Sequence, residues 1–181
     1  MNYQKITADW LEHFVIGLNL CPFAKKPFAT DKIIYRVEET TEVDKLMETL
    51  LTELLILNNT PATEISTTLI IHPNVLTDFL DYNDFLHIAN DILKRVDMEG
   101  IIQIASFHPD YRFAETQEND VTNYTNRSPF PMLHLLRESE VEQAVETYPE
   151  VEKIPVRNME QLESLGMKGW EKVSKKWKQN T

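Results

Sequence analysis

Hydrophobic residues along this chain recur with two different periods, and the alternation between these periods predicts an α/β fold. Amphipathic helices are predicted where apolar positions are three and four residues apart. Short runs dense in β-branched and apolar residues predict strands near 32–38, 67–72, 101–108 and 132–137. We therefore expect one domain over residues 1–181, in which helices cover a mixed, roughly four-stranded sheet.

The first helical segments have recognisable start and stop signals. An apolar helical pattern follows Thr7 and must end by Pro22, because a proline inside a helix loses a hydrogen bond and clashes with the preceding turn. Thr41 with Asp44 marks the start of a second helix. A third is predicted over 83–96 by a continuous apolar face.

The C-terminal third predicts further helices after the fourth strand. Ser139 and Glu142 have the spacing of a capping box, in which each side chain satisfies a backbone N–H at the start of a helix. Pro155 marks another helix start and Gly166 a stop, so we expect two short terminal helices. The second of these forms a basic helical tail over 167–181.

Two of the predicted strands end in the same way, with a histidine followed by a proline. TLIIHP closes the second strand and IASFHP closes the third. Two strands joined through a crossover helix are normally parallel, so their carboxyl ends lie at one edge of the sheet. We therefore expect His72 and His108 to be neighbours at an edge where α/β sheets tend to bind ligands, whereas His134 lies in mid-strand.

The segment from Pro109 to Pro131 has no convincing period and far exceeds the usual connection of about 4–6 residues. If the fourth strand runs antiparallel to the third, this loop returns to the same edge and brings Asn126, Arg127 and Ser128 with it. A guanidinium suits carboxylate or phosphate, and an amide both donates and accepts. These residues either bind a small anionic ligand or pin the loop through hydrogen bonds to its backbone.

The composition of the chain argues against some classes of protein. The formal net charge of −11 argues against nucleic-acid binding, because a negative field repels phosphate backbones. No apolar run approaches the roughly 20 residues of a membrane-spanning helix, and the N-terminus has no pattern of an export signal. The single cysteine excludes an internal disulfide, so we expect a cytoplasmic protein with no integral membrane association.

Two further candidate sites have competing interpretations. Cys21 is either a nucleophile, which needs thiolate character, or a packing residue beside Leu20 and Phe23, and the packing interpretation is favoured. His72 and His108 either hold a divalent metal or catalyse a reaction, or they bond to the backbone where strands end.

Two further clusters are better explained by structure than by ligands. Aspartates at 78, 81 and 84 lack the glycine turn and terminal glutamate of a calcium loop, which favours helix capping. An aromatic stripe at Trp170, Val173 and Trp177 is flanked by lysines. It either lies on an anionic surface or, as we favour, docks onto the acidic body.

Four segments resemble a known bacterial family. They are GLNLCPFA (17–24), LTDFLDYNDFL (76–86), SFHPDYRFA (106–114) and NYTNRSPFPMLHLLRE (123–138). The family is domain of unknown function 1415, and the resemblance runs over nearly the whole chain. It implies a single intact domain and gives these segments no chemical roles. The basic segment after Trp170 is the part least similar to the family pattern.

Two hypotheses for function follow from the candidate residues. In the first, the protein is an enzyme acting on a small anionic metabolite, with His108 as acid or base, Arg127 and Asn126 orienting the ligand and Cys21 as nucleophile. A metal held by His72 and His108 is a variant of it. In the second, the protein is a non-catalytic module that binds a ligand or a protein partner through the same edge and loop. A third interpretation is that these residues only build the fold.

Overall fold

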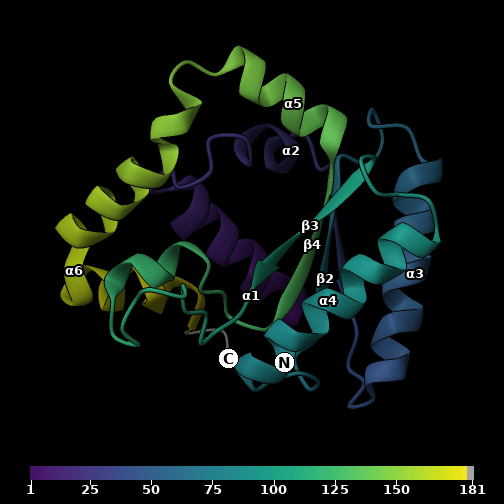
Figure 1. Ribbon diagram of the computed structural model, residues 1–181. Coiled ribbons are helices and arrows are strands. Elements are labelled where there is room, and N and C mark those ends of the chain that lie inside the picture. Colours follow the sequence, from purple (N-terminus) through teal and green to yellow (C-terminus); the bar gives the residue numbers. More distant parts are fainter. Residues whose placement is uncertain (179–181) are drawn as a thin grey trace.

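The computed structural model describes residues 1–178 and shows an α/β domain built on one mixed, four-stranded sheet (Figure 1). The strands are β1 (Ile33–Val37), β2 (Thr67–Ile71), β3 (Ile102–Phe107) and β4 (Met132–Arg137). They lie in the order β1-β2-β4-β3, with β1 and β2 parallel and β4 antiparallel to both of its neighbours. The sheet confirms the predicted fold class and strand positions, and β4 meets the condition, left open by the sequence, of running antiparallel to β3.

Helices connect and cover these strands. The α-helices are α1 (Tyr3–Trp10), α2 (Lys25–Ala29), α3 (Val43–Asn59), α4 (Phe79–Arg95), α5 (Glu138–Thr147) and α6 (Ile154–Lys178). Shorter turns of other helical types are the π-helical η1 (Leu11–Ile16) and the 3₁₀ turns η2 (Val121–Thr125) and η3 (Val151–Lys153). The long C-terminal helix is interrupted at Gly166, whose φ of 59° and ψ of 178° are not helical, so the predicted stop is seen as a kink.

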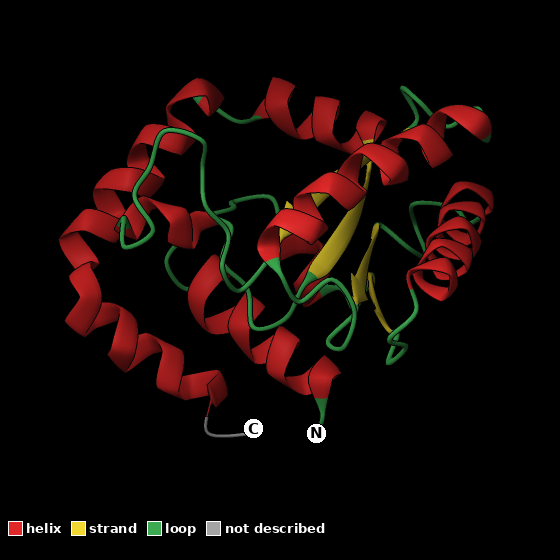
Figure 2. Cartoon of the chain, turned by 60° about the horizontal axis from the view of Figure 1, so that its bottom comes forward, coloured by secondary structure: helices red, strands yellow, loops and turns green. Residues whose placement is uncertain are grey.

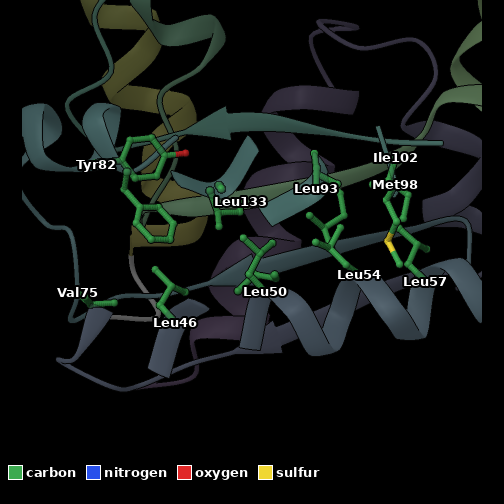
Figure 3. Close-up of a cluster of buried hydrophobic side chains, with 14 residues drawn as sticks. Leu46, Leu50, Leu54, Leu57, Val75, Tyr82, Leu93, Met98, Ile102 and Leu133 are labelled. Carbon is green, nitrogen blue, oxygen red and sulfur yellow. The ribbon is translucent and has the colours of Figure 1, made fainter. Parts of the chain in front are cut away.

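One face of the sheet is covered by α3 and α4. Figure 3 shows a row of leucines from α3, including Leu46, Leu50 and Leu54, that faces Leu93 of α4 and the sheet residue Leu133. Each of these side chains is buried. Their spacing of three and four residues puts them on one side of the helix, which is why the apolar stripe in the sequence becomes this core.

The opposite face is covered by α1, η1 and α6, and Figure 2 shows the start of α1 and the last turn of α6 on the same side of the molecule. Trp177 of α6 is 2% exposed and contacts Phe14 with ring centroids 5.9 Å apart. The aromatic stripe of the basic tail therefore docks onto the body, as the sequence favours. The last three residues of the predicted tail lie outside the described residues.

Three predicted helix starts are wrong, and one of these is the helix predicted over 83–96, which begins at Phe79. Asn2, and not Thr7, precedes the first helix, because its side chain accepts a hydrogen bond from the Lys5 N–H at 3.0 Å. The predicted capping box at Ser139 does not form, since β4 runs directly into α5 without a turn. The N–H of Glu138 is satisfied by the carbonyl of Ile101 instead.

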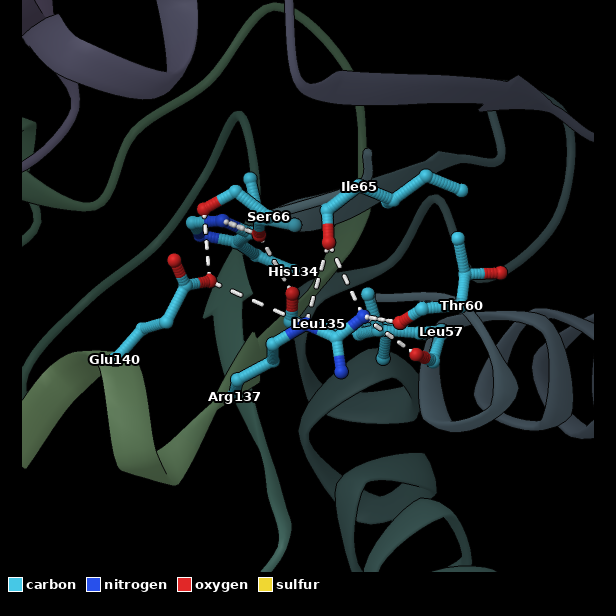
Figure 4. Close-up of polar contacts among 9 residues, drawn as sticks. Leu57, Thr60, Ile65, Ser66, His134, Leu135, Arg137 and Glu140 are labelled. Atoms are coloured by element: carbon cyan, nitrogen blue, oxygen red, sulfur yellow. Dashed lines mark hydrogen bonds and ion pairs between the residues drawn. The ribbon is translucent and has the colours of Figure 1, made fainter. Parts of the chain in front are cut away.

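Arg137, at the end of β4, caps the C-terminal end of α3 with its guanidinium (Figure 4). Its guanidinium donates to the carbonyls of Leu57, Thr60 and Ile65, the first at 2.6 Å. These carbonyls belong to the last turn of α3 and to the chain that leads into β2, where a helix leaves its C-terminal carbonyls without partners. A cation there also interacts favourably with the helix dipole. Glu140 stands 4.0 Å from the Arg137 Nε.

We predict that Arg137→Met lowers the free energy of unfolding by roughly 2–4 kcal/mol, because it removes a charged donor and leaves several carbonyls without partners. Urea unfolding followed by circular dichroism measures the change. Arg95→Met, on the exposed side of α4, is the matched control and should stay within about 0.5 kcal/mol of the parent chain. Equal stabilities of the two variants would contradict this role for Arg137.

Candidate functional site

The carboxyl ends of β2 and β3 meet at one edge of the sheet, as the sequence predicts. His72 follows β2 and His108 follows β3, and both side chains are fully buried. Both contact Tyr82 of α4, with ring centroids 5.8 Å (His72) and 5.1 Å (His108) from that of the tyrosine ring. The histidines are therefore neighbours through an aromatic ring, although β4 lies between their strands.

The side chain of Tyr82 links β3 to β4 at this edge of the sheet. Its hydroxyl donates to the Met132 carbonyl at 2.7 Å and accepts from the Phe107 N–H at 3.1 Å. Phe107 and Met132 are opposite each other in the β3–β4 register, so the hydroxyl forms the last link of that ladder. Burial raises the pKa of Tyr82, which keeps the hydroxyl protonated and able to donate.

His72 has one ring nitrogen with a partner and one without. Nδ1 lies 2.9 Å from the Val75 carbonyl, and because a carbonyl only accepts, Nδ1 carries the proton. Nε2 is then an acceptor, and it is buried with no partner among residues 1–178. Desolvation is the main reason why the pKa of His72 is lowered to about 4, and repulsion from His108 lowers it further. The hydrogen bond to the Val75 carbonyl acts in the opposite direction and raises the pKa. The ring is neutral at pH 7.

Both ring nitrogens of His108 have partners. Nε2 donates to the Leu76 carbonyl at 3.2 Å, and Nδ1 accepts from the Asp110 N–H at 3.0 Å. Burial is the main cause that lowers the pKa of this ring. The His108 backbone bonds to the long loop as well, with its N–H donating to Asn126 and its carbonyl accepting from Ser128. His108 thus fixes both ends of the loop.

This arrangement gives little support to a metal held by the two histidines. A metal ligand needs a free lone pair, and of the four ring nitrogens only Nε2 of His72 has one that no hydrogen bond uses. Within residues 1–178, no group of three or more His, Cys, Asp or Glu side chains is arranged to hold a metal ion.

Two of the three predicted loop residues pin the loop. The side chain of Asn126 donates to the Ser106 carbonyl at 3.1 Å, and the Ser128 hydroxyl donates to the Phe130 carbonyl at 2.6 Å. Both bonds are to backbone, which matches the structural interpretation of this segment. Asp78 is likewise structural, since its side chain caps α4 by accepting from the Leu80 N–H at 2.8 Å.

Arg127 is held in place by the loop but keeps donors to spare. Nε donates to the Tyr111 carbonyl at 3.1 Å and Nη2 to the Glu118 carbonyl at 2.7 Å, while the guanidinium lies 4.7 Å from the centre of the Tyr124 ring. These two bonds use two of its five N–H groups. The remaining three have no protein acceptor within the described part of the chain.

Arg127 lines a cavity of about 280 Å³ between the long loop, α1 and α6. The other charged groups in its lining are Lys178 and Asp110, so cations outnumber acids. Its aromatic lining consists of Tyr124 and all three tryptophans of the chain, Trp10, Trp170 and Trp177. Trp10 is 2% exposed, and its indole N–H has no hydrogen-bond acceptor within residues 1–178.

Cys21 lies at the other end of the sheet. Its neighbour Phe23 contacts Tyr148, which follows α5, with ring centroids 5.4 Å apart. In Figure 1, α2 and α5 are at the top, whereas α4 begins at the bottom beside the His72 edge. Burial raises the pKa of the Cys21 thiol, and this effect is larger than the lowering by hydrogen bonds from the Phe23 and Ala24 backbone. The structure does not bring Cys21 together with the histidines or Arg127.

Sequence reasoning missed the residues that define these two places. Tyr82 lies just before the helix predicted over 83–96, and nothing in the sequence shows that its hydroxyl reaches the ends of two strands. Trp10 is separated from Trp170 and Trp177 by most of the length of the chain, and only the packing of α6 on α1 brings the three to one cavity. No local signal marks them as a group.

Comparisons with known proteins identify a family and nothing more specific. A family model described as "Protein of unknown function (DUF1415)" matches residues 2–172. No match was found among curated proteins or among solved structures. None of the helices within residues 1–178 is long and apolar enough to cross a membrane.

We predict that Tyr82→Phe lowers the free energy of unfolding by roughly 2–3 kcal/mol, because the buried Met132 carbonyl and the Phe107 N–H both lose their partner. Tyr35→Phe is the control, since the Tyr35 hydroxyl has no hydrogen bond within residues 1–178. Chemical denaturation of the two variants compares them directly. If Tyr82→Phe is no less stable than Tyr35→Phe, the hydroxyl does not link the strands as described.

The buried histidines predict a loss of stability in mild acid. His72 and His134 have pKa values of about 4 in the fold, below the ordinary value of 6.5. Between those pH values the unfolded chain binds protons that the folded chain does not, so stability is complete above about pH 6.5 and falls as the pH drops towards about 4. The slope is at most roughly 1.4 kcal/mol per pH unit for each histidine.

His72→Asn tests this prediction, because asparagine keeps a donor near the position of Nδ1 but does not titrate. The free energy of unfolding of this variant, measured from pH 4 to 7, should fall less steeply than that of the parent chain. His87→Asn, on the exposed side of α4, should keep the parent slope. A parent slope in the His72 variant would show that His72 is not the buried, neutral group described.

Proposed function

Because the chain belongs to the DUF1415 family, which supplies no activity to carry over, we propose its function from the cavity beside Arg127: the protein is a non-catalytic module that binds a small anionic ligand there. The observation that carries this proposal is the set of free donors on Arg127. In a chain with a net charge of −11, its guanidinium lines the cavity and keeps three N–H groups without an acceptor among residues 1–178. A positive group with free donors attracts an anion.

Arg127 is suited to this role because its orientation is set before a ligand arrives. The carbonyls of Tyr111 and Glu118 and the ring of Tyr124 hold the guanidinium plane. Little side-chain freedom is then lost on binding, which favours affinity. The free N–H groups can form charge-assisted bonds with a carboxylate or phosphate.

The geometry favours binding over catalysis. Cys21 lies apart from the cavity, and burial raises the pKa of its thiol, which disfavours the thiolate that a nucleophile needs. His108 would have to give up a bond to Leu76 or to Asp110 before it could exchange a proton with a ligand. Binding through Arg127 needs neither change.

Charge and cysteine content support two further parts of the proposal. The net charge of −11 disfavours nucleic acid as a partner. Cys21, the chain's one cysteine, is unpaired, and free thiols are typical of proteins in reducing compartments. We therefore place the protein in the cytoplasm.

Titration with inorganic phosphate and with acetate at constant ionic strength tests the proposed function. All three tryptophans line the cavity, so the intrinsic tryptophan fluorescence of the protein should change when an anion binds. We predict that Arg127→Gln weakens binding by about tenfold or more, as expected for the loss of a charge-assisted hydrogen bond.

Arg112→Gln is the matched control, since Arg112 is an exposed residue of the same loop and does not line the cavity. It should bind both anions as the parent chain does. Thermal unfolding of both variants shows whether the loop and the domain remain folded. Equal affinities of the Arg127 and Arg112 variants, or no response to either anion, would rule out the proposed site.

A further inference from the structure

The sheet has two edge strands, β1 and β3, and the chain covers them unequally. At β3, the Ile102 N–H donates to the Met98 carbonyl at 3.0 Å. The Ser106 carbonyl, near the other end of β3, accepts from the side chain of Asn126 at 3.1 Å. Along the outer side of β1, no backbone N–H or carbonyl has a partner within residues 1–178. An open edge of this kind is a template for a further strand, which natural proteins usually block.

The register between β1 and β2 determines which residues of β1 point outward. The Glu38 N–H, just past the end of β1, donates to the Ile71 carbonyl at 2.8 Å. The Lys32 carbonyl, just before β1, accepts from the Ser66 N–H at 3.0 Å. Successive residues of a strand direct their backbone groups to opposite sides, so the even-numbered residues of β1 bond to β2. The outward residues are Ile33, Tyr35 and Val37.

The two ends of this edge carry opposite charges. The Lys32 ammonium has no ion-pair or hydrogen-bond partner among the residues that the structure describes. The Glu38 carboxylate accepts from the Thr40 N–H at 3.1 Å and from the Thr49 hydroxyl at 2.6 Å. A carboxylate can accept about four hydrogen bonds, so Glu38 has room for a further donor. The two ends are therefore complementary when a second strand runs in the opposite direction.

A second copy of β1 running antiparallel fits this edge. The register that uses all three outward residues places Tyr35 opposite Tyr35 of the second copy and Ile33 opposite Val37 of the second copy. Each such pair exchanges two backbone hydrogen bonds. In the same register, Lys32 lies opposite Glu38 of the second copy, once at each end of the contact. The same surface on both copies then satisfies itself, as the two-fold symmetry of most dimers requires.

The side chains at this edge suit the pairing. Two tyrosines that face each other across antiparallel strands form an aromatic pair, which stabilises a sheet. Ile34, which is 37% exposed, lies opposite Arg36 of the second copy and would lose exposed apolar area. Arg36 is already paired with the buried carboxylate of Glu53 at 2.7 Å, so it brings no unpaired charge into the contact.

From the open edge, its register and the opposite charges at its ends, we infer that the protein forms a symmetric dimer in which β1 pairs with β1 of a second copy. The two four-stranded sheets then become one continuous sheet. The contact is short, since β1 has five residues, so we expect a dissociation constant of roughly 1–100 µM. The inference goes beyond the proposed anion binding and does not depend on it, because no residue of β1 lines the Arg127 cavity.

Charge reversal at the two ends tests the register. Lys32→Glu brings two carboxylates together at each end of the contact, and Glu38→Lys brings two ammonium groups together. Each single variant should therefore dimerise at least about tenfold more weakly than the parent chain in sedimentation velocity. An equimolar mixture of the two variants should dimerise with the parent affinity, because an acid again meets a base at both ends. Lys172→Glu, on the exposed side of α6, changes the net charge as Lys32→Glu does and should dimerise as the parent chain does.

Amide hydrogen exchange provides a readout on the unmodified chain. The three outward N–H groups of β1 have no partner in a single copy, whereas the inward N–H groups of Ile34 and Arg36 bond to β2. Raising the protein concentration through the dissociation constant should slow exchange at the outward amides several-fold. Exchange at the two inward amides should stay the same.

Thermal unfolding followed by circular dichroism shows whether each variant is folded, and the exchange measurement needs no variant. A parent chain that stays monomeric up to about 500 µM, or outward amides whose exchange does not depend on concentration, would overturn the inference. A dimer that Lys32→Glu does not weaken would show that another surface forms the contact. A mixture of the folded variants that associates no better than either variant alone would show the same, and each of these results would overturn the pairing through β1.

Discussion

The hydroxyl of Tyr82 is the contact on which the histidine edge of the sheet depends. It bonds both to β3 and to β4, at the last register pair of these antiparallel strands, and so fixes where their ladder ends. Beyond that point the His108 backbone bonds to Asn126 and Ser128 of the long loop. The same ring packs against both buried histidines. One side chain from α4 thus sets the end of the sheet, the environment of the histidines and the departure point of the loop.

The histidines and the arginine at this edge serve different physical purposes. His72 and His108 lie on the α4 side of the sheet, neutral and buried, where their hydrogen bonds to backbone organise the strand ends. Arg127 lies on the loop, and its cavity faces α1 and α6 on the other side. Because His108 also bonds to Asn126 and Ser128, the histidine side holds the segment that presents Arg127. The histidines therefore support Arg127, the residue of the proposed site, without lining its cavity.

The sequence predicts the local elements well and the long-range packing poorly, for identifiable reasons. Strand positions and the shared edge of His72 and His108 follow from periodicity and from the direction of a crossover, which are properties of short segments. The insertion of β4 between β2 and β3 does not follow, because an antiparallel strand can pair with either edge of its neighbour. The sequence does not predict at which end of the sheet Cys21 lies, because the chain from Cys21 to β1 is long enough to reach either end. The first helix begins at Tyr3, directly after the capping residue Asn2, because a capping side chain outweighs the apolar pattern that starts later.

The cavity itself shows why residue types alone gave an incomplete picture of the site. Asn126, Arg127 and Ser128 are adjacent in sequence and have the residue types of one ligand clamp, yet all three bond to backbone carbonyls, and only Arg127 keeps three N–H groups without an acceptor among residues 1–178. Other parts of the cavity lining come from both ends of the chain, through Trp10 and Trp170. This cavity exists only after α6 has packed on α1, so its shape depends on the completed fold. A ligand that binds there would therefore stabilise the docked C-terminal helix, because it would bind only the folded chain.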